Sequence, residues 1–291
     1  MAELKFEDLL ATGAHFGHVT RKRHPNFNPF ILTQKNGVYI INLEETIRRM
    51  EKAKDLIREV IKKNGEILFV GTKKQAQDIV QEEADKCGMF YVVERWLGGT
   101  LTNFATIRKS IKRLQQLEKE GSSIYENLTK KEIQMLNRER IKLADQHRGI
   151  KDMKRLPDAI IVVDAKFETT AVKEATRLEI PVIAIVDSNT DPSRVTHPIP
   201  ANDDSIRTIQ LIMSALADEV IAAGGKEPGS DESTNGTVKP EAAAADVKGT
   251  EVPENTVQIT GSESEDETSA EKEIGDLEKE QEAEKELKEE V

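Results

Sequence analysis

Short apolar runs recur along the first two thirds of the chain and predict β-strands. They are rich in valine and isoleucine, and they span residues 38–41, 66–71, 90–93, 159–164 and 182–187. Between several of them, apolar residues recur every three or four positions, as they do on one face of a helix. Continuous apolar strands that alternate with helices are typical of a parallel sheet covered on both faces. The sequence therefore predicts an α/β fold.

Four helices are predicted around these strands. The first begins at Asn42, a residue type that caps helix N-termini, and Glu44 and Glu45 follow where acidic groups suit the helix dipole. It ends at Asn64 and Gly65, which are typical of a helix C-terminus. The other three helices are expected over residues 73–86, 169–179 and 205–223.

Residues 104–156 interrupt this alternation. Ile107, Ile111 and Leu114 have helical spacing, and a second helical stretch follows a glycine-serine break at residues 121–123. The pattern predicts an antiparallel helical hairpin, of the coiled-coil type, inserted between two strands. The segment carries 14 lysine and arginine residues against 7 acidic ones. We therefore expect a basic arm that projects from the sheet.

Charge divides the chain into two parts near Gly225. The whole chain of 291 residues has a net charge of −11, but residues 1–225 carry +3 and residues 226–291 carry −14. All twelve aromatic residues lie in the first part. A strongly acidic segment with few apolar residues cannot bury enough surface to offset the entropy of ordering. We expect an α/β domain over 1–225 and a disordered acidic tail over 226–291, which would stay in solvent.

Composition disfavours several classes of protein. The longest apolar runs span five residues, far short of the ~20 needed to cross a bilayer. The acidic N-terminus has no apolar stretch of the kind found in signal peptides. The single cysteine, Cys87, permits no internal disulfide and no thiolate metal cluster. A soluble, cytoplasmic protein without a membrane partner is expected.

Features at the strand ends raise an enzyme hypothesis, since α/β folds bind ligands beyond the carboxyl ends of their strands. Lys73 and Lys74 follow Gly71 there, but the second glycine of a phosphate-binding P-loop is missing. Asp164 and Asp187 end two strands and could hold Mg²⁺ or transfer protons. Capping and turn formation are the commoner roles of such aspartates, so the pattern favours a structural interpretation.

Three histidines lie close together near the N-terminus. His15 and His18 are three residues apart and His24 follows, a spacing that could ligate Zn²⁺ on a helix. No cysteine accompanies them and no further ligand is evident from the sequence. No metal or cofactor is therefore predicted, and whether these histidines bind a metal stays open.

Cationic clusters favour RNA binding. No acidic residue occurs between Asp8 and Glu44, where cations, histidines, asparagines and phenylalanines alternate on an expected loop. Cations suit phosphate contacts, and aromatic and amide groups suit base stacking and hydrogen bonding. A second cluster surrounds Arg95 and Trp96, although Trp96 could instead pack in the interior, and a third lies on the first hairpin helix.

Six strings of residues resemble one known family. In chain order they are HFGHVTRKRHPNFNPFI (15–31), ILFVGTKKQA (67–76), RWLGGTLTNF (95–104), LPDAIIVVDA (156–165), IPVIAIVDSNTDP (180–192) and NDDSIR (202–207). They are similar to motifs of the bacterial small-subunit ribosomal protein family S-two, in the same order and over essentially residues 1–225.

The resemblance implies a structural component of the small ribosomal subunit and not an enzyme. Members of the family have a Rossmann-like (flavodoxin-like) sheet with a protruding helical hairpin, and they bind small-subunit ribosomal RNA. They join the particle late in assembly and help to recruit the largest small-subunit protein, S-one, for translation. No cofactor or small-molecule substrate is implied. The candidate RNA-binding residues are Arg21, Lys22, Arg23, His24, Lys35, Lys73, Lys74, Arg95, Trp96, Arg108, Lys109, Lys112 and Arg113.

Two alternatives stay open beside this hypothesis. One is an α/β enzyme that uses a nucleotide or sugar phosphate near Gly71, Asp164 and Asp187. The other is a scaffold whose helical hairpin docks a partner helix in place of RNA.

Overall fold

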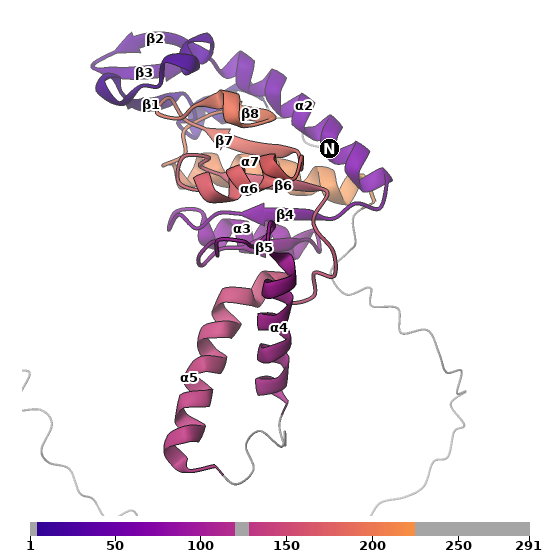
Figure 1. Ribbon diagram of the computed structural model, residues 1–291. Helices are drawn as coiled ribbons and strands as arrows, with labels where there is room; N and C mark the ends of the chain where they lie inside the picture. Colours follow the sequence, from indigo (N-terminus) through magenta and orange to yellow (C-terminus); the bar gives the residue numbers. More distant parts are fainter. Residues whose placement is uncertain (1–4, 120–127, 225–291) are drawn as a thin grey trace, which may run out of the picture. The chain divides into compact units, whose positions relative to one another are not determined.

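Five parallel strands form the central sheet of the computed structural model, which describes residues 5–119 and 128–224 (Figure 1). Their spatial order is β5–β4–β6–β7–β8. The strands span Ile67–Val70 (β4), Phe90–Val92 (β5), Ala159–Val163 (β6), Val182–Val186 (β7) and His197–Pro200 (β8). Every residue of β4, β6 and β7 is buried, as expected for strands covered on both faces. The predicted α/β fold is confirmed.

Helices cover both faces of this sheet. Their bounds are Phe6–Ala11 (α1), Leu43–Lys62 (α2), Gln77–Lys86 (α3), Phe104–Glu118 (α4), Lys130–His147 (α5), Thr169–Arg177 (α6) and Ile206–Ala222 (α7). Residues of α2, α3 and α7 pack with Phe69 and Ile161 in one hydrophobic cluster. Residues of α4 and α6 pack with Leu68 and Ile160 in a second. Successive side chains of a strand point to opposite faces, so the two clusters share the same strands.

Local interactions explain where the helices begin. Asn42 caps α2 as predicted, because its side chain accepts a hydrogen bond from the Glu44 N–H at 3.0 Å. Ser205 caps α7 by accepting one from the Thr208 N–H. The predicted start of α3 at residue 73 is wrong, since the helix begins at Gln77. Lys73 anchors the loop before α3, because its ammonium group binds carboxylates that follow β8.

A second sheet, which the sequence did not predict, precedes α2. It contains β1 (Phe16–Val19), β2 (Ile31–Lys35) and β3 (Val38–Ile41) in the order β1–β3–β2, and both pairings are antiparallel. The expectation that residues 38–41 belong to the parallel sheet is therefore wrong, as is the expectation of a loop before them. Asn36 and Gly37 join β2 to β3 with positive φ angles of 51° and 74°, the geometry of a tight two-residue hairpin.

Strand β8 was also missed by the sequence pattern. It contains Pro198 and Pro200, which lack the N–H that a ladder hydrogen bond requires. The strand lies at the edge of the sheet and pairs only with β7 among the described strands. An edge position tolerates proline because one side of the strand needs no donor.

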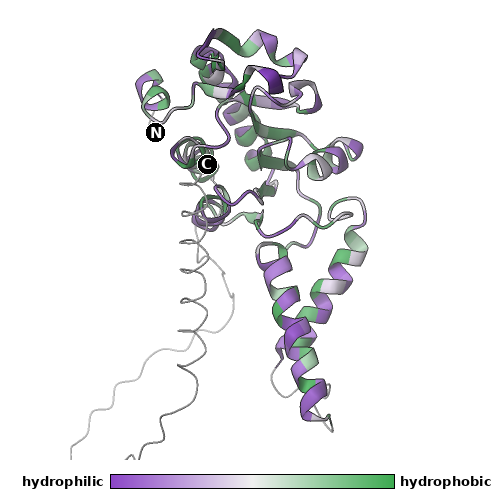
Figure 2. Cartoon of the chain, turned by 90° about the vertical axis from the view of Figure 1, so that its left-hand side faces the viewer, coloured by the Kyte–Doolittle hydropathy of each residue, from purple (hydrophilic) through white to green (hydrophobic). Residues whose placement is uncertain are grey.

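Helices α4 and α5 lie between β5 and β6 in the chain and pack against each other. Figure 1 shows them side by side, extending away from the sheet on the side of β5. Figure 2 shows that hydrophilic and hydrophobic residues alternate along both helices. A capping box starts α5, in which Thr129 and Glu132 exchange hydrogen bonds. The residues between the two helices (120–127) and the predicted tail (226–291) lie outside the described residues.

Within the described part of the chain, each helix is too short or too polar to span a bilayer.

Candidate nucleic-acid interface

The N-terminal antiparallel sheet presents four of the predicted RNA-binding cations. Arg21 and Lys22 lie in a single exposed 3-10 turn after β1, and Arg23 follows it. The Arg23 guanidinium lies 5.5 Å from the centre of the Tyr39 ring, where a cation is attracted to the aromatic face. Lys35 is exposed at the end of β2. All four side chains are therefore on the surface and available to an anionic partner.

The loop after β7 anchors this cationic segment. The backbone N–H of His24 donates to the Ser188 carbonyl oxygen at 2.8 Å. The Asn26 amide donates to Asp191 Oδ1 at 3.0 Å, and His24 Nδ1 lies 3.9 Å from the same oxygen. These contacts join segments more than 160 positions apart in the chain. The cations therefore stand on a supported turn and not on a free loop.

The RWLGG turn is organised around one buried carboxylate, that of Glu174 on α6. It accepts hydrogen bonds from the Trp96 indole, from the backbone N–H groups of Gly99, Leu101 and Thr102, and from the Thr102 hydroxyl, at 2.8 to 3.2 Å. Burial raises the pKa of Glu174, but these donors outweigh it and hold that pKa below its usual value. Trp96 is only 8% exposed, so the structure favours the packing alternative for Trp96 over stacking on RNA.

Arg95, next to Trp96, is exposed and faces α5. It lines a surface pocket of about 420 Å³ together with Glu94, Arg138, Ile141 and Lys142, among other residues. Neither Arg138 nor Lys142 is among the residues that the sequence predicted to contact RNA. Only the positive charge of the whole segment 104–156 pointed to them.

Helix α4 carries the third predicted cluster. Arg108, Lys109 and Lys112 are exposed, whereas Ile107 and Ile111 are buried against the protein. The fourth candidate, Arg113, is partly buried at the boundary between these faces. Its Nε lies 3.2 Å from Glu139 Oε1 of α5. Arg113 therefore also joins the two helices.

Lys73 and Lys74 differ in their surroundings, although the sequence treats them alike. Lys74 is exposed. Lys73 is only 14% exposed at its side chain, and its Nζ lies 2.6 Å from Asp204, 3.0 Å from Asp203 and 3.6 Å from Asp164. Burial lowers the pKa of Lys73, but the neighbouring carboxylates outweigh this and raise it. The prediction of Lys73 as a free phosphate contact needs correction, because its ammonium group is already bound inside the protein.

Asp164 at the end of β6 and Asp191 in the loop after β7 form turns, as the structural interpretation predicts. Asp187, at the end of β7, accepts a hydrogen bond from the Ser188 N–H and contacts His18 Nδ1. Asp164 Oδ1 accepts hydrogen bonds from the N–H groups of Lys166 and Phe167 at 2.9 and 3.0 Å. Asp191 Oδ1 accepts one from the Ser193 N–H at 3.1 Å and caps the short helix that follows. Side-chain acceptors of this kind stabilise turns locally. The carboxylates of Asp164 and Asp191 therefore have structural roles that require no ligand.

The three N-terminal histidines do not converge. His18 lies in strand β1, so the helical spacing that would bring it to His15 is absent. The His15 ring lies against Phe16, with ring centres 4.0 Å apart. His18 contacts Asp187, and His24 contacts Asp191. The hydrogen bond with Asp187 raises the pKa of His18.

Two aspartates after β8 were missed as site residues. Asp203 is fully buried, and burial together with Asp164 and Asp187 raises its pKa to about 7. Asp204 is exposed and bonded to Lys73, which lowers its pKa. Asp203 and Asp204 gave no local signal, because their partners Lys73 and His18 lie far away in the sequence.

The chain combines a parallel α/β core with exposed cations on the N-terminal sheet and on α4. Proteins of this class, with cations clustered on a folded core, are suited to a polyanionic partner. Comparison with protein families identifies the family to which the chain belongs. The family model described as ribosomal protein S2 matches residues 9–223, so the chain belongs to the ribosomal protein S2 family. It is a structural constituent of the small ribosomal subunit, a ribonucleoprotein that acts in translation, and the family is not one of enzymes.

Proposed function

We propose that this chain binds small-subunit ribosomal RNA through exposed cations of the N-terminal sheet, of the loops after β4 and β5, and of α4, as part of cytoplasmic ribosomes. Lys73 and Trp96 are left out of this surface, because the first is bound to carboxylates and the second packs in the interior. The residues proposed to contact RNA are Arg21, Lys22, Arg23, His24, Lys35, Lys74, Arg95, Arg108, Lys109, Lys112 and Arg113.

One observation on α4 carries this proposal. Arg108 and Lys112 are four residues apart, so their side chains lie on the same face about 6 Å apart along the axis. Both are exposed, and neither has an ion-pair partner within residues 5–119 and 128–224. A row of unpaired cations can neutralise phosphates without first breaking a bond inside the protein. Its affinity for RNA should then depend steeply on salt.

Charge reversal at this row tests the proposal. Arg108→Glu with Lys112→Glu should weaken binding to small-subunit particles depleted of this protein at least tenfold at low salt. Two lost phosphate contacts should also reduce the slope of log affinity against log salt by about 1.4 to 1.8. Arg113 is left unchanged because its reversal would also break the contact with Glu139.

The matched control reverses two exposed lysines of α2, Lys52→Glu with Lys62→Glu, which changes the net charge by the same amount. The control should retain both the affinity and the salt slope. An equal loss in the control would show that total charge matters and the α4 row does not, and an unchanged slope in the α4 variant would reject the proposed contacts.

The second part of the proposal concerns late assembly and recruitment of the largest small-subunit protein. Its support is a set of exposed apolar side chains on the antiparallel sheet, with Leu32 exposed by 66%, Phe16 by 50% and Val19 by 46%. Exposed apolar patches mark surfaces that contact other proteins, and these three side chains lie on the two strands that flank β3. Leu32→Ser should reduce retention of that protein on reconstituted particles, while Ile206→Ser, at a residue of α7 that is 55% exposed, should not. Equal retention with both variants would reject this surface.

A further inference from the structure

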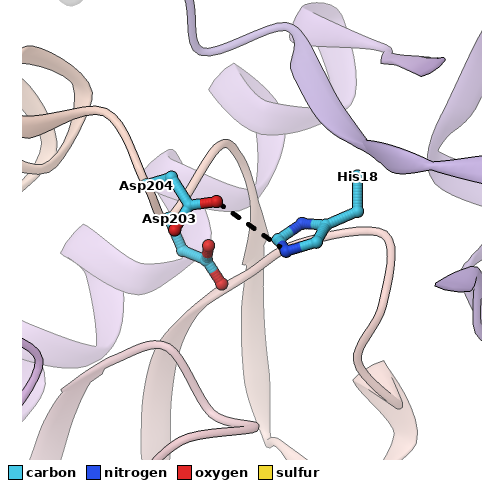
Figure 3. A group of neighbouring side chains, drawn as sticks. All are labelled: His18, Asp203 and Asp204. Atoms are coloured by element: carbon cyan, nitrogen blue, oxygen red, sulfur yellow. Dashed lines mark ion pairs between the residues drawn. The ribbon is translucent and has the colours of Figure 1, made fainter. Parts of the chain in front are cut away.

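Side chains from two distant segments meet at the carboxyl edge of the parallel sheet (Figure 3). His18 comes from β1, and Asp203 and Asp204 follow β8. One nitrogen or oxygen atom from each of these residues lies within 4.8 Å of the others. Open α/β sheets bind ligands at this edge. None of the three residues belongs to the proposed RNA surface.

A buried carboxylate fixes the orientation of His18. Nδ1 of His18 lies 2.5 Å from Oδ2 of Asp187, whose side chain is 1% exposed. An ionised carboxylate only accepts hydrogen bonds, so Nδ1 carries the proton of a neutral ring and the Nε2 lone pair is left free. Nε2 points toward Asp204, whose Oδ2 lies 3.7 Å away (Figure 3). A carboxylate behind a histidine in this way is a common support of metal-bound imidazoles.

Asp203 supplies the second, independent observation. Its residue is fully buried, and its Oδ2 has no hydrogen-bond partner among the described residues. The other oxygen, Oδ1, lies 3.0 Å from the Lys73 ammonium. Buried polar atoms in proteins are almost always paired. An unpaired, buried carboxyl oxygen in the same cluster as the His18 imidazole suits a cation that both residues can bind.

We propose that His18, Asp203 and Asp204 bind one Zn²⁺ ion, with Asp187 orienting the histidine and water completing the coordination. An imidazole nitrogen with carboxylate oxygens suits Zn²⁺, whereas Mg²⁺ and Ca²⁺ prefer oxygen ligands alone. Zn²⁺ bonded at about 2.0 Å to tetrahedral ligands holds them about 3.3 Å apart. The cluster therefore contracts when the ion binds. The ion would join β1, which leads into the cationic turn, to the end of β8.

The competing explanation is an ion network without metal, in which Lys73 and a protonated His18 neutralise the aspartates. The two explanations differ in what the full-length protein binds after treatment with a chelator. Titration with ZnCl₂ at pH 7.5 should show one ion bound per chain by calorimetry. CoCl₂ should give visible absorption bands of a four-coordinate site. Absence of stoichiometric binding would establish the metal-free network and overturn the proposal.

Variants assign the ligands. His18→Gln and the exposed Asp204→Asn should each weaken Zn²⁺ binding at least 100-fold, and Asp187→Asn should weaken it 10- to 100-fold as a supporting residue. His197→Gln, at the far end of β8, and the surface variant Asp218→Asn are matched controls and should bind as the unaltered chain does. Circular dichroism shows whether each variant is folded. Full affinity in folded Asp204→Asn and His18→Gln would place the ion elsewhere and refute this site.

Discussion

The Trp96 indole N–H donates to Oε1 of Glu174, 78 positions later in the chain, at 3.2 Å, and both residues are buried. The same carboxylate holds three backbone N–H groups of the turn that follows Trp96. This pair therefore joins α6 to the turn between β5 and α4. It fixes the start of the helix that carries the proposed RNA contacts.

Removing this carboxylate should destabilise the fold. Glu174→Ala leaves the indole and three backbone N–H groups without their acceptor, and we expect the free energy of unfolding to fall by about 3 kcal/mol. Urea denaturation measures the change. Glu82→Ala, on the exposed face of α3, should change it by less than about 0.5 kcal/mol. Equal effects of the two substitutions would mean that Glu174 does not organise the turn.

A buried histidine should make the contact between α4 and α5 sensitive to pH. His147 is fully buried, its Nε2 lies 2.8 Å from Ser110 Oγ of α4, and burial lowers its pKa below 6.5. The unfolded chain therefore binds a proton more readily than the folded one. The free energy of unfolding should decrease as pH falls below 6.5 and stay level with respect to this group above that value.

His147→Gln isolates this contribution. Other histidines with lowered pKa values, His15 and His197, remain in the variant. The test therefore compares how steeply the free energy of unfolding changes with pH in the variant and in the unaltered chain. Urea denaturation between pH 5 and 7.5 should show a smaller decrease on acidification in the variant than in the unaltered chain. Identical slopes would exclude His147 as a source of the pH dependence.

The 3-10 turn that follows α5 (Arg148–Ile150) should be intolerant of a single methyl group at Gly149. A Cβ there would lie 2.2 Å from the Tyr91 carbonyl oxygen, a backbone atom of β5 that cannot move aside without disturbing the sheet. Gly149→Ala should lower the midpoint of thermal unfolding by several degrees, corresponding to about 1–3 kcal/mol. Gly98→Ala is the control, since nothing lies within 4 Å of its Cβ position. A midpoint unchanged by Gly149→Ala would contradict this packing.

The parallel sheet could be predicted because strands buried on both faces require apolar runs such as 159–163 and 182–186, and helical patterns lie between several of these runs. Strand β8 could not, because Pro198 and Pro200 hide an edge strand. The antiparallel sheet was missed for a different reason. Residues 38–41 were expected in the parallel sheet, while β1 and β2 are short, mix apolar with polar residues and follow no regular alternation. Only Asn36-Gly37 marks the hairpin that the structure contains.

The candidate site was predicted in part for similar reasons. Charge alone located Arg108 and Lys112, since a cation on a helix face opposite apolar residues is exposed by the helical period. The charge pattern alone wrongly predicted Lys73 as a free phosphate contact, because the carboxylates that bind it lie 91 to 131 positions away. His18 and Asp187 are 169 positions apart. Contacts between such distant positions depend on the order of strands in the sheet, which local patterns do not encode.

A cryo-electron microscopy map of small ribosomal subunits that contain this chain tests the central proposal most directly. It should place the guanidinium of Arg108 and the ammonium of Lys112 within about 4 Å of RNA phosphate oxygens, with Arg21 and Lys22 also facing RNA. A map in which α4 and the turn after β1 face open solvent, with RNA elsewhere, would contradict it.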